Sequence, residues 1–120
     1  MIKLPNGDRA IVPEAKITRY LLDLTSKRGQ PKAQFFIAFG FTMEAWELLA
    51  TALRQHALAH DIASTRETSY GVHYSIEGEL QTPDQRNPQV RSVWKIEKGE
   101  TVPALVTAYP LDERQSDATL

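Results

Sequence analysis

The sequence predicts an α+β domain in which N-terminal helices pack on one face of a four-stranded antiparallel meander sheet. Apolar residues recur at helical spacing up to about residue 60, and the hydrophobic period then changes to two. Short stretches rich in Gly, Pro, Asp and Asn separate the later segments, which favours antiparallel pairing in chain order. Residues 1–111 are expected to form a single domain, and residues 112–120 a flexible polar tail.

Three helices are expected in the first half of the chain. The first opens at Pro13, because proline is tolerated at the first helical position. The second starts at Pro31 and closes at Gly40, and the third is capped by Thr42 and runs to about His60. Their buried stripes are expected to comprise Ile17, Tyr20, Leu21, Leu24, Phe35, Phe36, Phe39, Trp46, Leu49, Leu53 and Leu58.

Four strands are expected in the second half. They are Ile62–Thr68, Gly71–Leu80, Gln89–Glu97 and Val102–Tyr109. Successive side chains of a strand point to opposite faces, so the alternation separates an apolar face from a polar one. The apolar face is expected to hold Val72, Tyr74, Ile76, Val90, Trp94 and Ile96. In the last strand, one face is expected to hold Leu105, Thr107 and Tyr109.

Composition narrows the possible functions. The chain has 120 residues, a net charge of -1 and no cysteine, which excludes disulfides, thiolate nucleophiles and cysteine metal sites. Nucleic acid binding would need a local basic patch, and no DNA specificity is implied. No apolar run is long enough to cross a membrane, and the N-terminus lacks the apolar core of a signal peptide. We therefore expect a cytoplasmic protein with no membrane partner and no cofactor.

The register of the central hairpin gathers polar side chains on the uncovered face. A loop centred near Asp84 places His73 opposite Lys95 and Glu77 opposite Arg91. Histidine titrates near neutral pH and serves as a general acid or base, and arginine binds phosphate bidentately. Such a pattern also occurs on any solvated sheet face, where opposed charges form surface pairs.

The last strand extends this polar face. A tight turn before it would set Tyr109 near Arg91, and Thr107 near Lys95 or Val93. Tyrosine donates hydrogen bonds and stacks on bases, so the whole set has the groups needed to cleave an RNA phosphodiester without a metal.

Two further groups of residues are candidate sites. Arg28 and Lys32 form a small basic cluster between the first helices, and Lys32 is close enough to a helix start to reach a phosphate. Such clusters are also common at solvated helix ends. His56 and His60 are four residues apart on a predicted helix, so both could bind one metal ion. The sequence shows no third ligand at a spacing typical of a metal site, so no metal site is predicted.

Several segments resemble a family of small uncharacterised bacterial domains, which occur alone and at the C-termini of polymorphic toxins. They are Leu4–Ala10, Arg28–Phe36, Phe39–Gly40 and Trp94–Ile96. The helices followed by a meander that ends in Thr107-Ala108-Tyr109-Pro110 are also similar to the barnase/EndoU/colicin/RelE superfamily of toxin ribonucleases. The superfamily resemblance implies RNA cleavage without metal. Relatives often read Gly-Lys-His-Lys where this chain has Gly29-Gln30-Pro31-Lys32, so this chain would depend on His73 for an imidazole.

The sequence thus predicts a metal-independent endoribonuclease of toxin type, with RNA as substrate and an immunity or antitoxin protein as partner. The resemblance and the polar face together give the catalytic residues His73, Arg91, Lys32, Thr107 and Tyr109, with Lys95 and Arg28 binding substrate. The alternative is a non-catalytic binding module, such as an immunity, antitoxin or adaptor protein that uses the exposed sheet face. A third alternative is a structural subunit, which would show an exposed apolar patch and a stable oligomer.

Overall fold

The computed structural model describes residues 2–111 and confirms the α+β class. The predicted tail, residues 112–120, lies outside the described residues. The helical elements are η1 (Gly7–Arg9), α1 (Glu14–Lys16), η2 (Ile17–Leu21), α2 (Gln30–Ala38) and α3 (Trp46–Ala59). The strands are β1 (Ile62–Thr68), β2 (Gly71–Glu79), β3 (Gln89–Glu97) and β4 (Ala104–Pro110).

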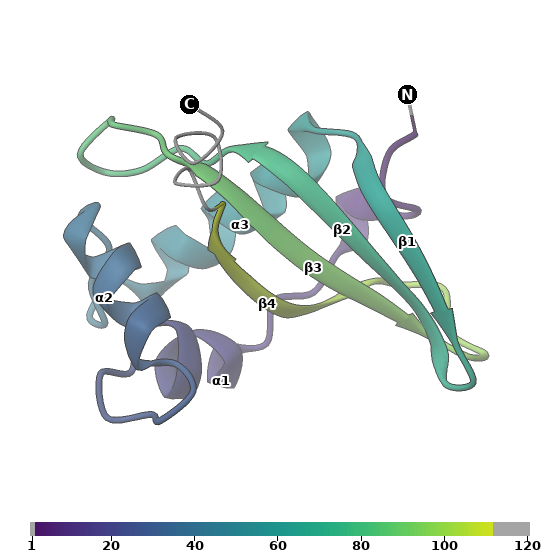
Figure 1. The fold of residues 1–120 in the computed structure, drawn as a ribbon, viewed down its shortest axis with the longest axis horizontal. Coiled ribbons are helices and arrows are strands. Elements are labelled where there is room, and N and C mark those ends of the chain that lie inside the picture. Colours follow the sequence, from purple (N-terminus) through teal and green to yellow (C-terminus); the bar gives the residue numbers. More distant parts are fainter. Residues whose placement is uncertain (1, 112–120) are drawn as a thin grey trace, which may run out of the picture.

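The strands form one antiparallel sheet in chain order, β1-β2-β3-β4. Figure 1 shows α3 crossing behind this sheet, with α1 and α2 beyond the β4 edge. The face of the sheet nearer to the viewer carries no helix among the described elements. We call it the open face. It is the surface on which the functional side chains were predicted to lie.

The predicted register of the central strands is confirmed. His73 pairs with Lys95, and Glu77 with Arg91. On the next strand Tyr109 pairs with Arg91. Cross-strand partners share a face of the sheet, so all five side chains belong to the open face.

A bulge in β4 makes one prediction wrong. Val93 pairs with Thr107, but its neighbour Trp94 pairs with Leu105, so Val106 is the extra residue. The bulge shifts the alternation by one position. Leu105 is therefore buried beside Trp94 under the helices and does not share the face of Thr107.

The helical half departs further from the sequence pattern. The short α1 continues into a π-helical turn, in which the Leu22 amide donates to the Ile17 carbonyl at 2.8 Å. Gly40 ends α2 as predicted, with φ +105°. The helix α3 begins at Trp46, three residues later than expected, because the Thr42 hydroxyl accepts from the Ala45 amide in a turn before it.

Most of the predicted stripe residues pack into one core between α3, the other helices and the back of the sheet. Trp94, Phe36, Leu49, Leu53 and Ile76 are fully buried there. Three stripe residues do not join them: Leu24 and Leu58 are about half exposed, and Phe39 is half-buried outside this core. No helix within residues 2–111 has both the length and the apolar character that crossing a bilayer needs.

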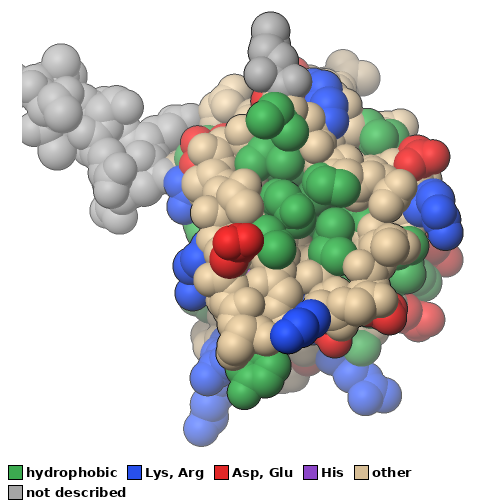
Figure 2. Space-filling model, turned by 90° about the vertical axis from the view of Figure 1, so that its right-hand side faces the viewer, with side chains coloured by type: hydrophobic (Ala, Val, Ile, Leu, Met, Phe, Trp, Pro, Cys, Tyr) green, Lys and Arg blue, Asp and Glu red, His purple; other side chains and the backbone are tan. Residues whose placement is uncertain are grey.

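The N-terminal arm closes one end of the sheet. Its residue Ile11 forms a parallel bridge with Ala104, which covers the start of the β4 edge. Ile2 and Ile11 of this arm are 69% and 52% exposed. Figure 2 shows apolar side chains gathered in the middle of this end, with charged side chains around them.

Candidate functional site

The site begins where the helical layer meets the open face. The hydroxyls of Tyr20, on η2, and Thr107, on β4, form a hydrogen bond of 3.0 Å. The π-helical turn brings Tyr20 to this position at the β4 edge, where its ring packs against the core and its hydroxyl reaches the sheet. This contact joins the predicted site residue Thr107 to a helix that the sequence assigned only to the core.

Cations surround Tyr20. The ammonium of Lys32, in the first turn of α2, lies 5.4 Å from the centre of the Tyr20 ring, and that of Lys16 lies 5.8 Å from it. Burial alone would raise the pKa of Tyr20. The hydrogen bond with Thr107 and the two ammonium groups outweigh burial, so the pKa is lowered overall. The phenol is thereby made easier to ionise.

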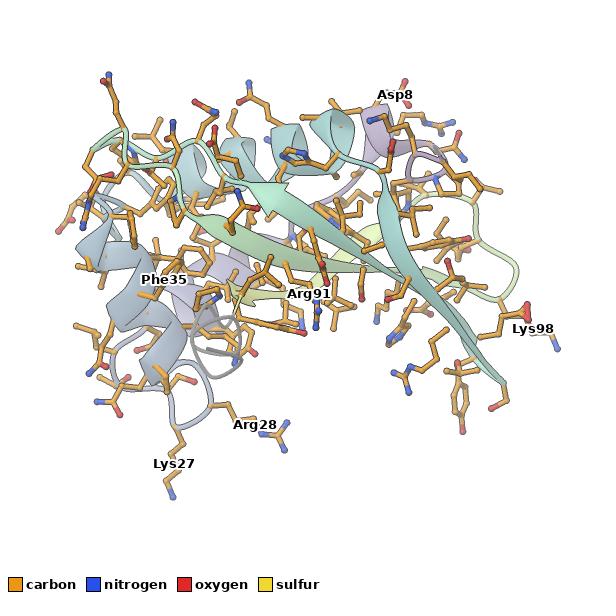
Figure 3. All side chains as sticks on the ribbon, turned by 45° about the horizontal axis from the view of Figure 1, so that its top comes forward. Asp8, Lys27, Arg28, Phe35, Arg91 and Lys98 are labelled. Carbon is orange, nitrogen blue, oxygen red and sulfur yellow. The ribbon has the colours of Figure 1, made fainter. Side chains whose placement is uncertain are left out.

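A groove of about 580 Å³ opens beside the Tyr20–Thr107 pair. Its lining residues are Pro13, Ala15, Lys16, Tyr20, Arg28, Val106 and Thr107, which include two cations and no carboxylate. We call it the cationic groove. Figure 3 shows Arg28 extending from the loop before α2, apart from Arg91 over the middle of the sheet. None of the ion pairs within residues 2–111 involves Lys16, Arg28 or Lys32.

Arg91 has a different environment. Its Nε donates to Glu77 Oε2 at 2.8 Å, and Nη2 forms an ion pair with the same carboxylate. Its Nη1 donates to the Tyr109 hydroxyl at 3.1 Å. The hydrogen bond to Tyr109 is the largest cause that raises the pKa of Arg91, and the bonding to Glu77 is the next. A phosphate would have to compete with Glu77 for this guanidinium.

His73 lies apart from the cationic groove. From a strand spacing of about 4.8 Å and a rise of about 3.3 Å per residue, His73 is roughly 12 Å from Thr107 across the sheet. It lines a separate hollow of about 300 Å³ with Lys95 at the β1–β2 hairpin. The structure thus brings Lys32, Arg28 and Thr107 together at the β4 edge through Tyr20, with Tyr109 two residues further along β4. It places His73, on β2, and Lys95, on β3, in the separate hollow.

The two helical histidines have structural partners. His56 is 2% exposed, and its ring contacts Ser92 Oγ and the carbonyls of Gly78 and Val90. His60 Nε2 lies 2.9 Å from the Glu79 carbonyl. Within the described residues, no three His, Asp or Glu side chains are grouped to hold a metal ion.

Sequence reasoning missed Tyr20 and Lys16 as site residues. Tyr20 belongs to an apolar stripe at helical spacing, and this pattern predicts only that its aromatic ring is buried in the core. One signal was present: a tyrosine hydroxyl in a buried stripe needs a hydrogen-bond partner. The partner itself depends on the bulge and the π-helical turn, which the pattern did not show.

Comparison with known proteins places the chain in a family. Residues 3–112 match the family described as domain of unknown function (DUF6883), so the chain belongs to it. No curated protein matches the sequence. The fold is similar to a chain of a contact-dependent growth inhibition toxin–immunity protein complex from Klebsiella pneumoniae 342. The TM-score is 0.67 at 16% identity, over 84% of this chain and 99% of that one.

Proposed function

We propose that this member of the DUF6883 family is a metal-independent endoribonuclease of bacterial toxin type, with its reaction centre at Lys32, Tyr20 and Thr107. One observation carries the proposal: the Tyr20–Thr107 pair stands at a groove that has cations and no carboxylate in its lining. Such a groove suits the phosphates of a nucleic acid backbone. The fold similarity to a chain from a toxin–immunity complex supports a role in such a system, as either the toxin or the immunity protein.

The reaction would begin with attack by the 2′-oxygen of RNA on the adjacent phosphorus. The 2′-O–P bond forms and the P–O5′ bond breaks, which leaves a 2′,3′-cyclic phosphate and a 5′-hydroxyl. Ionised Tyr20 takes the proton of the 2′-hydroxyl, and the Lys32 ammonium gives a proton to the leaving 5′-oxygen. The Thr107 hydroxyl donates its one hydrogen to ionised Tyr20, Arg28 holds the non-bridging oxygens, and the cations stabilise the charge that grows on them.

The remaining predicted residues take supporting roles in this proposal. Tyr109 and Arg91 border the reaction centre along β4 and β3, and Glu77 neutralises part of the Arg91 charge. His73, roughly 12 Å from Thr107, lies too far away to share the scissile phosphate. Lys95 is paired with Glu97 and would contact another part of the substrate. An immunity partner for such a toxin would act by covering the cationic groove.

A second function is favoured by the ion pairs of the open face. Glu77 pairs with Arg91, and Glu97 pairs with Lys95 at 3.1 Å, as on a solvated surface. In that case the protein is a non-catalytic binding module of a toxin–immunity system, and the open face docks a protein. This function requires no RNA cleavage.

The test is cleavage of a single-stranded RNA oligonucleotide by the purified protein in excess chelator. Wild type should yield 2′,3′-cyclic phosphate ends, and kcat/KM should rise with pH toward the Tyr20 pKa, which is lowered from 10.0. Tyr20→Phe should lower kcat by about 10²- to 10⁴-fold and remove that rise. The matched control is Tyr74→Phe, on the opposite face of the sheet.

Two results would overturn the proposal. Wild type that leaves RNA intact in chelator supports the binding module instead. Cleavage that persists in both Tyr20→Phe and Lys32→Gln would place the reaction elsewhere on the molecule. Thermal unfolding of each variant checks that the fold is kept.

A further inference from the structure

The β1–β2 hairpin carries a second hollow on the molecule. Its volume is about 300 Å³, and Thr68, Tyr70, His73, Lys95 and Glu97 are among the residues that line it. This volume is at the lower end for small-molecule pockets, so it suits one planar group better than an extended chain. The hollow lies away from the reaction centre proposed above.

Tyr70 is the most unusual residue of this hollow. Its side chain is 83% exposed, the largest exposure among the large hydrophobic residues of the described chain. The backbone beneath it is nevertheless fixed, since the Tyr70 amide donates to Thr68 Oγ1 at 3.1 Å and its carbonyl accepts from the Lys98 amide at 2.8 Å. The hairpin therefore presents an aromatic ring that contributes little to the core.

The polar groups of the hollow complement a base and its phosphate. Arg66 Nη2 lies 3.4 Å from His73 Nδ1, which makes Nδ1 the acceptor and leaves Nε2–H as a donor. Lys95 Nζ lies 3.1 Å from Glu97 Oε1, so a cation and a carboxylate stand together at the same wall. Donor, acceptor and cation are thus all present beside an exposed aromatic ring.

We propose that this hollow binds one unpaired nucleobase of the RNA strand whose scissile phosphate lies at the cationic groove, with the base stacked on Tyr70. The inference rests on the proposed function and extends it to substrate length. Tyr70 lies one residue beyond Gly71, which pairs with Glu97, and this puts it roughly 19 Å from Thr107 across the sheet. At the stacked spacing of about 3.4 Å per nucleotide, one strand needs about five to six nucleotides to join the two places.

The experiment compares two substrates and one variant. Tyr70→Ala should raise KM for an eight-nucleotide RNA about fivefold or more, because stacking on an aromatic ring is worth roughly 1–3 kcal/mol per base. The same variant should leave cleavage of a dinucleotide unchanged, since a dinucleotide cannot reach the hollow. Tyr70→Phe keeps the ring and should behave as wild type, which separates stacking from a hydroxyl contact.

A second assay measures base stacking on Tyr70 without requiring RNA cleavage. A 2′-O-methyl oligonucleotide carrying 2-aminopurine binds but cannot react, and its fluorescence should be quenched by wild type and not by Tyr70→Ala. If wild type cleaves RNA but Tyr70→Ala changes neither KM nor quenching, this inference is wrong and the proposed function stands. If wild type cleaves nothing, the reaction is wrong, and quenching alone then supports or overturns the base site.

Discussion

His56 shows how a single buried side chain is committed to one protonation state. Trp94 Nε1 donates to Ser92 Oγ at 2.8 Å, so the Ser92 hydroxyl hydrogen is free to point to His56 Nδ1 at 2.9 Å. His56 Nε2–H is then shared by the carbonyls of Gly78 and Val90 at 3.1 and 3.0 Å. A protonated ring would put two hydrogens between Nδ1 and Ser92 Oγ. The network therefore holds a neutral imidazole.

The stability of the protein should depend on pH through His56. Burial is the main cause that lowers its pKa below 6.5 in the folded state. The unfolded chain then binds a proton first as pH falls, so this stabilisation is complete above about pH 6.5 and is lost down to the folded-state pKa. Urea unfolding at a series of pH values should show a slope approaching about 1.4 kcal/mol per pH unit in that window.

The control for this prediction is His56→Gln. The variant should be less stable than wild type at pH 8, by about 1–3 kcal/mol, because buried partners lose their bonds. Its stability should also vary less with pH below 6.5. His60 and His73 remain in both proteins, so the difference between the two profiles isolates His56. Parallel profiles would show that His56 is not the group that titrates.

At the scale of elements, the strands were more predictable than the helices. Alternation in β2 and β3 is uninterrupted, and a slip by one residue would turn every side chain to the wrong face, so sequence and register agree. In β4 the bulge at Val106 breaks this rule, and neither neighbour of Val106 in the sequence is a glycine or a proline that would have indicated it. A single-residue insertion of this kind depends on tertiary contacts, which a local pattern does not contain.

The candidate site was only partly predictable for the same reason. Thr107 and Lys32 were identified from the sequence, yet the group that joins them, Tyr20, comes from a helix whose last turn is π-helical. A period of 3.6 residues cannot specify that turn. The prediction that His73 and Thr107 lie on the same face of the sheet is confirmed. A shared face does not specify how far apart two residues lie, and these two are on strands that are not adjacent.

Gly29, the residue before α2, lies where the chain packs closely against η2. A Cβ built on Gly29 would lie 2.2 Å from the Tyr20 carbonyl oxygen, so the two segments cannot approach this closely with any larger residue. We expect Gly29→Ala to lower the free energy of unfolding by about 2 kcal/mol and to reduce RNA cleavage, because Lys32 moves away from Tyr20. Urea denaturation and the cleavage assay measure these effects.

The control for Gly29 is Gly7→Ala. Gly7 is also buried, but a Cβ built on it would meet Leu58 at an ordinary 3.5 Å. This control should change stability and cleavage only slightly. Equal losses in the two variants would mean that close packing at Gly29 has no special role in the site.

At the scale of the whole molecule, the net charge is near neutral, but positive charge is concentrated at the cationic groove. The chain carries a net charge of -1, and Lys3, Arg86, Arg91 and Lys95 are each paired with a carboxylate. The cations at the cationic groove are not among the paired ones within residues 2–111. The attraction for RNA should therefore come from this groove and not from the charge of the molecule as a whole.

This concentration of positive charge predicts how RNA binding responds to salt. The logarithm of the binding constant for single strands should fall with log salt by about 0.7 per phosphate contacted. The double variant Lys16→Gln, Arg28→Gln should reduce that slope by about 1.4, whereas Lys3→Gln with Arg86→Gln should leave it nearly unchanged, because Asp61 and Asp84 already neutralise those cations. Fluorescence anisotropy with a 2′-O-methyl oligonucleotide measures the slope. Equal slopes for both double variants would mean that RNA does not use the cationic groove, and the open face would then have to be considered as a surface for a protein partner.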